Sequence, residues 1–248
     1  MIEIKSEILK WSRKTVAKKS ELQSVLGKLL WVSKTVKFSR VFVARIIAET
    51  RKLQRQSEKT VLSNDIRKDF LWWHNFLEVF NGVELIPPIG PTLAIYGDAC
   101  PQSGGSWNES VAEYFSLDFP TYLCSADTPI HTKEFIVVIL SARLWGPKWA
   151  GNRVVIYCDN DAVCDTIVYQ KPKDITMQKM LREFLYWICR YNFTPVLEKI
   201  GTKDNDVADF LSRNTNPSDI DAFFTSKGMS KQTKVEIPIE WFEFKADW

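Results

Sequence analysis

The chain has 248 residues, 45% of them hydrophobic and 13% aromatic, and a formal net charge of +3. This composition is ample for a packed core, and no apolar run approaches the ~18–20 residues of a membrane-spanning helix. The amino terminus carries lysines but no apolar segment, so we expect no secretory signal. With only two histidines, the sequence excludes a histidine-rich metal site and gives poor support to a Ser-His-Asp triad.

The cysteines are odd in number and no pair of them has CxxC spacing. We therefore expect a reduced, intracellular protein, cytoplasmic or nuclear, without a zinc knuckle or a disulfide framework. The five are Cys100, Cys124, Cys158, Cys164 and Cys189.

Charge is distributed unevenly along the chain. Residues 1–90 contain 17 Lys and Arg against 9 Asp and Glu, whereas residues 91–248 contain 16 against 21. A basic segment joined to an acidic one suggests a part that faces nucleic acid and a part that binds cations. A solvated helical surface is an equally weighted alternative for the basic segment.

Residues 1–84 predict a small all-α unit. Apolar residues at helical spacing indicate a helix over Ser20–Lys37, a second over Phe38–Gln56, and a third that begins at Ser63 as N-cap and ends at Asn81-Gly82. Aromatic residues at helical spacing are more often core than ligand-binding. We therefore expect a core containing Trp72 or Trp73, Phe76 and Phe80.

Residues 85–91 contain three prolines and a glycine and predict an extended linker. Residues 92–213 then alternate between strand and helix patterns, which predicts an α/β domain with a mixed five-stranded sheet and helices on both faces. Residues 214–248 are an extension whose packing the sequence does not define. The predicted elements after the first strand are Val111–Leu117, Thr121–Cys124, Arg153–Cys158 and Phe193–Ile200 as strands and Thr132–Trp145, Asp161–Tyr169, Met177–Tyr191 and Asp204–Arg213 as helices.

The first strand of this domain begins at Thr92, with Leu93 and Ile95 alternating with Ala94 and Tyr96. It ends at an acidic residue, Asp98, and the segment through Pro101 to Gly105 predicts a turn. A carboxylate at the carboxyl end of a strand is open to a ligand and is held by a rigid backbone.

Three further acidic residues are expected near Asp98. Glu134 lies in the first turn of a predicted helix, Asp159 follows a predicted strand, and Asp209 lies in the last predicted helix. Sites in open α/β sheets gather at strand ends and at the helices nearest them. Four carboxylates in one place repel each other unless cations neutralise them, and two Mg²⁺ ions match both the charge and the oxygen ligands. Mn²⁺ is a suitable substitute. Two such ions suit hydrolysis of a phosphodiester.

The order of these carboxylates along the chain resembles that in proteins with the ribonuclease H fold. The residue sequences of the motifs resemble those of reverse transcriptases of LTR-type and DIRS-like retrotransposons. The most specific motif is Asn205–Arg213 (N-D-V-A-D-F-L-S-R), supported by Tyr96–Ala99 and Val155–Asn160. Leu26–Trp31 and Phe70–Gly82 resemble the helical thumb-like region that precedes this domain. The resemblance covers roughly residues 20–213.

The resemblance implies cleavage of the RNA strand of RNA–DNA hybrids, with Asp98, Glu134, Asp159 and Asp209 as catalytic metal ligands. It also implies the polymerase portion of a reverse transcriptase as a partner. No membrane partner is expected. Asn160 is a candidate contact for the substrate backbone or for a metal-bound water. Ser125, Thr132 and Gln102 are candidate contacts for 2′-hydroxyls, although turn and capping roles are favoured for these three. Asp206 is either a support for the metal ligands or a charge at the start of the last helix.

One departure from the family pattern affects the expected rate. Cellular ribonucleases H commonly carry a histidine in the loop before the last helix, but Gly201–Asp204 contains none. We therefore expect slower turnover. Asn160 also breaks the resemblance of Tyr157–Asn160 to the polymerase signature Tyr-x-Asp-Asp, so no polymerase site is predicted.

Two alternatives remain open. The first is a catalytically weak or domesticated scaffold that binds nucleic acid through residues 1–60. The second is another nuclease on the same fold, such as an integrase or resolvase, although the motif at Asp209–Arg213 counts against it.

Overall fold

The computed structural model describes residues 2–36, 39–79, 92–170, 172–201 and 203–243. Within them, residues 2–79 form one compact unit and residues 92–243 form another. The predicted linker at 85–91, the predicted helix stop at Asn81-Gly82 and the core residue Phe80 lie outside the described residues. No helix in the described ranges is both long and apolar enough to cross a membrane.

The first unit is mainly helical but not all-α, so that part of the prediction is wrong. Two three-residue strands pair antiparallel, with Ala17 opposite Thr60. The elements are α1 (Ile2–Arg13), β1 (Val16–Lys18), α2 (Lys19–Val32), a 3₁₀ helix (Ser39–Phe42), α3 (Ala44–Lys52), β2 (Lys59–Val61) and α4 (Asn64–Val79).

Stacked aromatic rings form the core of this unit, as the helical spacing predicted. Trp72, Trp73 and Phe76 are fully buried. The Trp72 ring stacks on Phe42 at 3.5 Å and on Phe76 at 4.9 Å between centroids. The predicted N-cap is also confirmed, because the Ser63 hydroxyl accepts the Ile66 N–H at 3.3 Å.

The predicted helix over Phe38–Gln56 is shorter in the structure, and the reason is a local turn. The Glu58 carboxylate accepts the backbone N–H groups of Gln54 at 2.7 Å and of Arg55 at 3.1 Å. These bonds satisfy donors that a longer helix would use internally, so α3 ends at Lys52 and the chain turns into β2.

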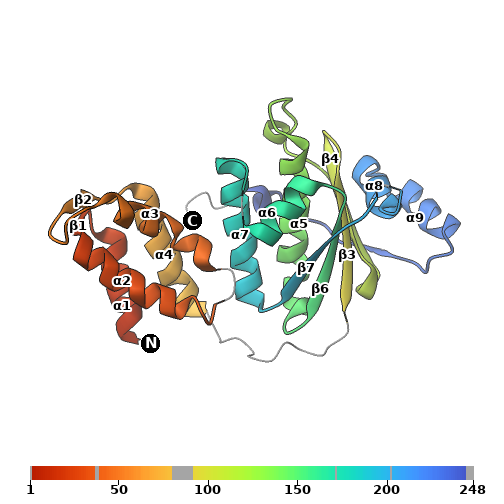
Figure 1. Cartoon of the computed structure of the whole chain (residues 1–248). Helices are drawn as coiled ribbons and strands as arrows, with labels where there is room; N and C mark the ends of the chain where they lie inside the picture. The colour runs from red at the N-terminus through yellow and green to blue at the C-terminus, as the bar shows by residue number, and fades with distance from the viewer. Residues whose placement is uncertain (1, 37–38, 80–91, 171, 202, 244–248) are drawn as a thin grey trace. The chain divides into compact units, whose positions relative to one another are not determined.

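The second unit has a mixed six-stranded sheet in the order β7-β6-β3-β4-β5-β8, with helices on both faces (Figure 1). This confirms the predicted fold class, with one strand more than the predicted five. The elements are β3 (Leu93–Ala99), β4 (Ser103–Asn108), β5 (Glu113–Asp118), α5 (Ile130–Trp145), β6 (Arg153–Cys158), α6 (Asp161–Tyr169), α7 (Ile175–Tyr191), β7 (Thr194–Lys199), α8 (Asp206–Arg213), α9 (Pro217–Ser226) and β8 (Thr233–Lys234).

The segment through Gly105 was predicted to be a turn, but Gly104 and Gly105 lie in strand β4. Their lack of a side chain allows helices to approach both faces of the sheet. A Cβ atom on Gly104 would lie 2.6 Å from the Val137 side chain of α5, and one on Gly105 would lie 2.6 Å from backbone and side-chain carbons of Leu211 in α8. These glycines therefore mark close packing.

The predicted strand Thr121–Cys124 is instead a 3₁₀ helix, Thr121–Leu123. The Leu123 N–H donates to the Pro120 carbonyl at 2.8 Å and the Cys124 N–H donates to the Thr121 carbonyl at 3.1 Å. These i to i+3 bonds use the donors that a strand would offer to a neighbour. The antiparallel meander is thus β3-β4-β5.

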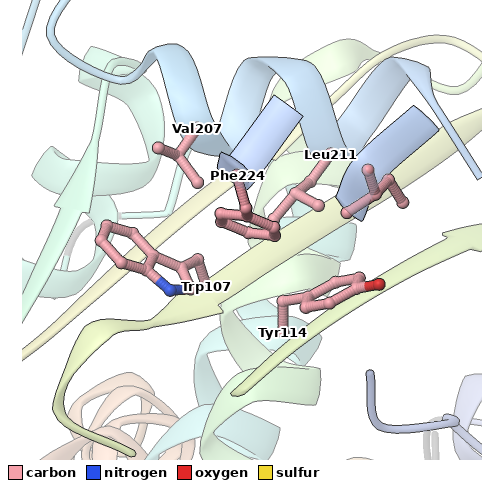
Figure 2. Close-up of a cluster of buried hydrophobic side chains, with 6 residues drawn as sticks. Trp107, Tyr114, Val207, Leu211 and Phe224 are labelled. Atoms are coloured by element: carbon pink, nitrogen blue, oxygen red, sulfur yellow. The ribbon is translucent and has the colours of Figure 1, made fainter. Parts of the chain in front are cut away.

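The carboxyl-terminal extension is an integral part of the second unit. Strand β8 pairs in parallel with β5, and the buried Gln232 side chain accepts the Trp107 indole N–H at 2.9 Å. Figure 2 shows the apolar cluster that α8 and α9 form over the sheet. Its buried members are Trp107, Tyr114, Val207, Leu211, Ile220 and Phe224.

Candidate nuclease site

Parallel pairing of β3 and β6 places two of the predicted carboxylates at the same edge of the sheet. Tyr96 lies opposite Tyr157 in the ladder. Asp98, two residues beyond Tyr96, is the penultimate residue of β3, and Asp159 directly follows β6. Asp98 is buried, and Asp159 is half-buried.

Two helices on opposite faces of the sheet supply the other two carboxylates. Glu134 projects from the second turn of α5 and is buried. Asp209 lies in the first turn of α8 and its side chain is 33% exposed. The Asn205 amide donates to the Gly97 carbonyl at 3.2 Å, which fixes the start of α8 to β3.

The charge environment of Asp98 shows that this carboxyl is close to its expected partners. Burial raises the pKa of Asp98, and the charges of Asp159 and Asp209 raise it further. The Ser212 hydroxyl opposes this effect by donating to Asp98 Oδ2 at 2.6 Å. Asp98 therefore interacts with carboxylates from both β6 and α8.

Glu134 is perturbed more strongly. Burial is the main cause that raises the pKa of Glu134 to about 8, and the charges of Asp159 and Asp98 add to it. The Asn160 side chain has the opposite effect because it hydrogen-bonds the carboxyl group. The structure thus brings together all four predicted carboxylates, two of them buried and mutually repelling.

Such a set of groups fits divalent cations. Buried carboxylates that raise one another's pKa are stabilised when a cation replaces the shared protons. Oxygen donors from two strands and two helices are the ligands that Mg²⁺ and Mn²⁺ prefer. The donor atoms of Glu134 and Asp159 lie within 4.8 Å of each other, and Cys158 Sγ lies within the same distance of both.

Arg213 provides a positive charge beside this cluster. Its Nε and Nη2 atoms contact Asp209 Oδ1 at 2.9 and 2.8 Å. The pairing spans one turn of α8 and holds the Asp209 carboxylate in position.

Asn160, a predicted substrate contact, and Asp206, a predicted support for the metal ligands, lie in different surroundings. Asn160 is the N-cap of α6, where its Oδ1 accepts the Ala162 N–H at 2.9 Å, and it also bonds Glu134. Asp206 forms an ion pair with Lys227, which follows α9. Asn160 thus lies against the carboxylates, whereas Asp206 holds the extension against α8.

The predicted substrate contacts divide into two groups. Gln102 and Ser125 line a pocket of about 380 Å³ at the start of α5, together with Lys133. The Ser125 hydroxyl also accepts the Asp127 N–H at 3.2 Å, which is a turn-forming role. Thr132 is only 3% exposed and does not line this pocket.

Four residues of the site have contacts that the sequence did not predict: Ser212, Asn205, Arg213 and Cys158. Ser212 and Arg213 lie three and four residues after Asp209, and that helical spacing was the available signal. Cys158 ended a continuous apolar run and gave no signal of its own.

Comparison with models of protein families finds no match, and comparison with curated proteins finds none either. Among solved structures, the chain is similar to the N-terminal RNase H domain of rv2228c from Mycobacterium tuberculosis, at 14% identity and a TM-score of 0.39. That match covers 56% of this chain and 99% of that one.

Two foamy viral protease-reverse transcriptase structures are also similar. One, in complex with an RNA/DNA hybrid, has 14% identity and a TM-score of 0.33, with 82% of this chain and 27% of that chain covered. The other, in complex with dsDNA, has 15% identity and a TM-score of 0.31, with 82% and 42% covered. The chain thus spans less than half of these viral proteins. All of these TM-scores lie below 0.5, so none of the matches assigns an activity to this chain.

Proposed function

We propose that this chain is a metal-dependent endonuclease that hydrolyses the RNA strand of RNA–DNA hybrids, as part of a retroelement reverse transcriptase of LTR-type or DIRS-like kind. The observation that carries the proposal is the convergence of Asp98, Glu134, Asp159 and Asp209. The burial of Asp98 and Glu134 and the repulsion between the carboxylates support a cation site. Bound there, two Mg²⁺ ions would activate the attacking water and stabilise the leaving oxygen.

The residues around the carboxylates position them for this role. Ser212 orients Asp98 through its short hydrogen bond, and Asn160 orients Glu134. Both bonds link a metal-ligand candidate to a neighbouring element, so they limit rotation of the carboxyl groups. Arg213 does the same for Asp209.

The pocket at the start of α5 is a suitable contact for the hybrid. Gln102 and Ser125 offer neutral polar groups in this pocket, and such groups suit 2′-hydroxyl and phosphate oxygens. In this proposal residues 1–84 are a thumb-like region, 85–91 a linker, 92–213 the nuclease domain and 214–248 its extension. The polymerase portion of the enzyme is the expected partner.

The proposal is tested with a labelled RNA–DNA hybrid in Mg²⁺ or Mn²⁺. We expect cleavage of the RNA strand by the wild-type chain and its loss in Asp159→Asn. Asp209→Asn and Asp206→Asn form a matched pair on one helix: the first is expected to lose at least a hundredfold in rate and the second less than threefold. Cleavage that persists unchanged in Asp159→Asn would overturn the mechanism.

A second function is favoured by the basic segment, residues 1–90. In that case the chain is a scaffold that binds hybrids without cutting them. Tight, salt-sensitive binding without any cleavage in either metal would favour the scaffold, because neutralised phosphates make affinity fall steeply with salt.

A further inference from the structure

A pair of thiols lies beside the carboxylate cluster. Cys158 ends β6 and is 1% exposed, and Cys164 lies in the first turn of α6. The Cys164 Sγ atom is 3.9 Å from the Cys158 carbonyl oxygen, so the second thiol lies beside the end of β6. Cys158 Sγ is 3.9 Å from Glu134 Oε2, so the sulfur pair adjoins one of the buried carboxyl groups.

Glu134, Cys158 and Asp159 form a compact set of donor atoms. One ligand atom from each lies within 4.8 Å of the other two. Metal–ligand distances of ~2.0–2.3 Å place the ligands of one tetrahedral ion roughly 3.3–3.8 Å apart. The one separation given individually, 3.9 Å between Cys158 Sγ and Glu134 Oε2, is close to this range, and the others exceed it by at most about 1.5 Å. Across the described residues, no other group of His, Cys, Asp and Glu is gathered this closely.

Sulfur changes which ion this set prefers. Mg²⁺ takes oxygen ligands, whereas thiolates select Zn²⁺ and other thiophilic ions. We propose that Cys158, Glu134 and Asp159 form a site for a thiophilic divalent cation such as Zn²⁺, and that Cys164, which lies outside this compact set, turns toward the bound ion as its fourth ligand. Binding exchanges the thiol protons for the metal and releases them to solvent, so no oxidant or reductant is needed.

The site overlaps the proposed nuclease centre, because Glu134 and Asp159 belong to both. A Zn²⁺ ion held by sulfur withdraws these carboxylates from Mg²⁺ and so inhibits cleavage. This regulatory consequence rests on the proposed function, whereas the binding site itself rests only on the positions of the donor atoms.

Binding is tested with Co²⁺, because thiolate ligands give this ion a charge-transfer band in the near ultraviolet that oxygen ligands do not. We expect the band to saturate at one Co²⁺ per chain and to be displaced by Zn²⁺. Cys158→Ser is expected to abolish the band. Cys164→Ser is expected to halve its intensity and to raise at least tenfold the metal concentration needed for saturation, because one thiolate ligand is lost. Cys124→Ser is the matched control and is expected to leave the band unchanged, because the hydrogen bonds of this thiol go to the backbone carbonyls of Gln102, Phe119 and Pro120.

Folding of each variant is checked by circular dichroism. A second readout on the unaltered chain keeps the test decisive if Cys158→Ser fails to fold. In the wild-type protein, Zn²⁺ is expected to slow alkylation of Cys164 at least tenfold and to leave the alkylation of Cys124 unchanged. A wild-type protein without the Co²⁺ band, or equal Cys164 alkylation with and without Zn²⁺, would overturn the site.

The inhibitory role is tested by the ratio of cleavage rates in Mg²⁺ with and without added Zn²⁺, which normalises each protein to its own rate. We expect Zn²⁺ to lower the wild-type rate at least tenfold and the Cys164→Ser rate less than threefold. Equal inhibition of both proteins contradicts regulation through the thiols. If the wild-type chain cleaves no hybrid at all, the proposed function fails, and the Co²⁺ experiment still decides on the metal site.

Discussion

Replacement of Glu134 by glutamine is expected to stabilise the protein in the absence of metal. The buried carboxyl group has a pKa of about 8 in the folded chain against an ordinary value of 4.5. The unfolded chain releases this proton above about pH 4.5 while the folded chain retains it. The free energy of unfolding therefore falls between about pH 4.5 and pH 8 and is lowest above that range.

The size of this effect follows from the pKa difference. Each unit of difference between the folded and unfolded pKa values corresponds to 1.36 kcal/mol, so the loss in the free energy of unfolding has an upper bound of about 5 kcal/mol. Water penetration and side-chain relaxation reduce the cost of a buried charge. We therefore expect the free energy of unfolding of Glu134→Gln to exceed that of the wild type by about 2–3 kcal/mol above pH 8 and by much less near pH 5. Glutamine retains an oxygen that accepts the hydrogen bond from Asn160 and loses at most the long contact of 3.9 Å from the Cys158 thiol.

The assay is urea denaturation in a metal chelator at pH values from about 5 to about 9. Hydrogen exchange of the α5 amides identifies the transition that belongs to the second unit. Glu198→Gln, an exposed carboxylate on β7, serves as the control and should show no pH-dependent gain. A stability difference between Glu134→Gln and the wild type that stays constant with pH would refute the assigned electrostatics. Added Mg²⁺ should stabilise the wild type more than the variant.

Three further substitutions test other features. Gly105→Ala should lower the free energy of unfolding by about 1–3 kcal/mol because the new Cβ meets α8. Gly27→Ala, at an exposed helical position with free space around it, should raise it by about 0.5–1 kcal/mol. Thermal unfolding compares the two variants, and equal effects would contradict the close packing at Gly105. Phe224→Ala should cost about 3–5 kcal/mol by emptying the cluster in Figure 2, and a loss below about 1 kcal/mol in urea titration would show that the extension is not integral. Ser212→Ala should raise the pKa of Asp98 further and move the acidic limb of the cleavage–pH profile upward, and an unmoved limb would exclude the hydrogen bond as its cause.

The parts of the fold that the sequence predicted well have strong local signals. Strand β6 and helix α6 have the predicted boundaries, Arg153–Cys158 and Asp161–Tyr169, because a continuous apolar run meets an Asn160 cap. Helix α1 was missed although Ile8 and Trp11 have helical spacing and are buried. The apolar spacing near the amino terminus was therefore sufficient to predict this helix.

Other parts depend on contacts between distant segments. A pair of glycines such as Gly104 and Gly105 is typical of a turn. Here they lie in a strand because α5 and α8 pack too closely against the sheet for a side chain at these positions. The packing of the extension likewise depends on the bond between Gln232 and Trp107, which are 125 residues apart.

In the site, too, local sequence signals predicted some features and contacts between distant segments determine the others. The motifs identified four carboxylates and their order along the chain, and the structure brings these residues together. Their burial, the hydrogen bond from Ser212 and the neighbouring thiols depend on three-dimensional packing. The catalytic and metal-binding roles remain predictions.

The parallel pairing of β3 with β6 also sets a length scale. The ladder ends at Tyr96 opposite Tyr157, an offset of 61 residues, and the same offset two residues further relates Asp98 to Asp159. Neighbouring strands are about 4.8 Å apart, which is close to the ~3.5–4 Å separation of two ions that share a phosphate. In the proposed function, strand pairing would therefore set the spacing of the two cations, and a slip of one residue would turn one carboxylate to the opposite face of the sheet.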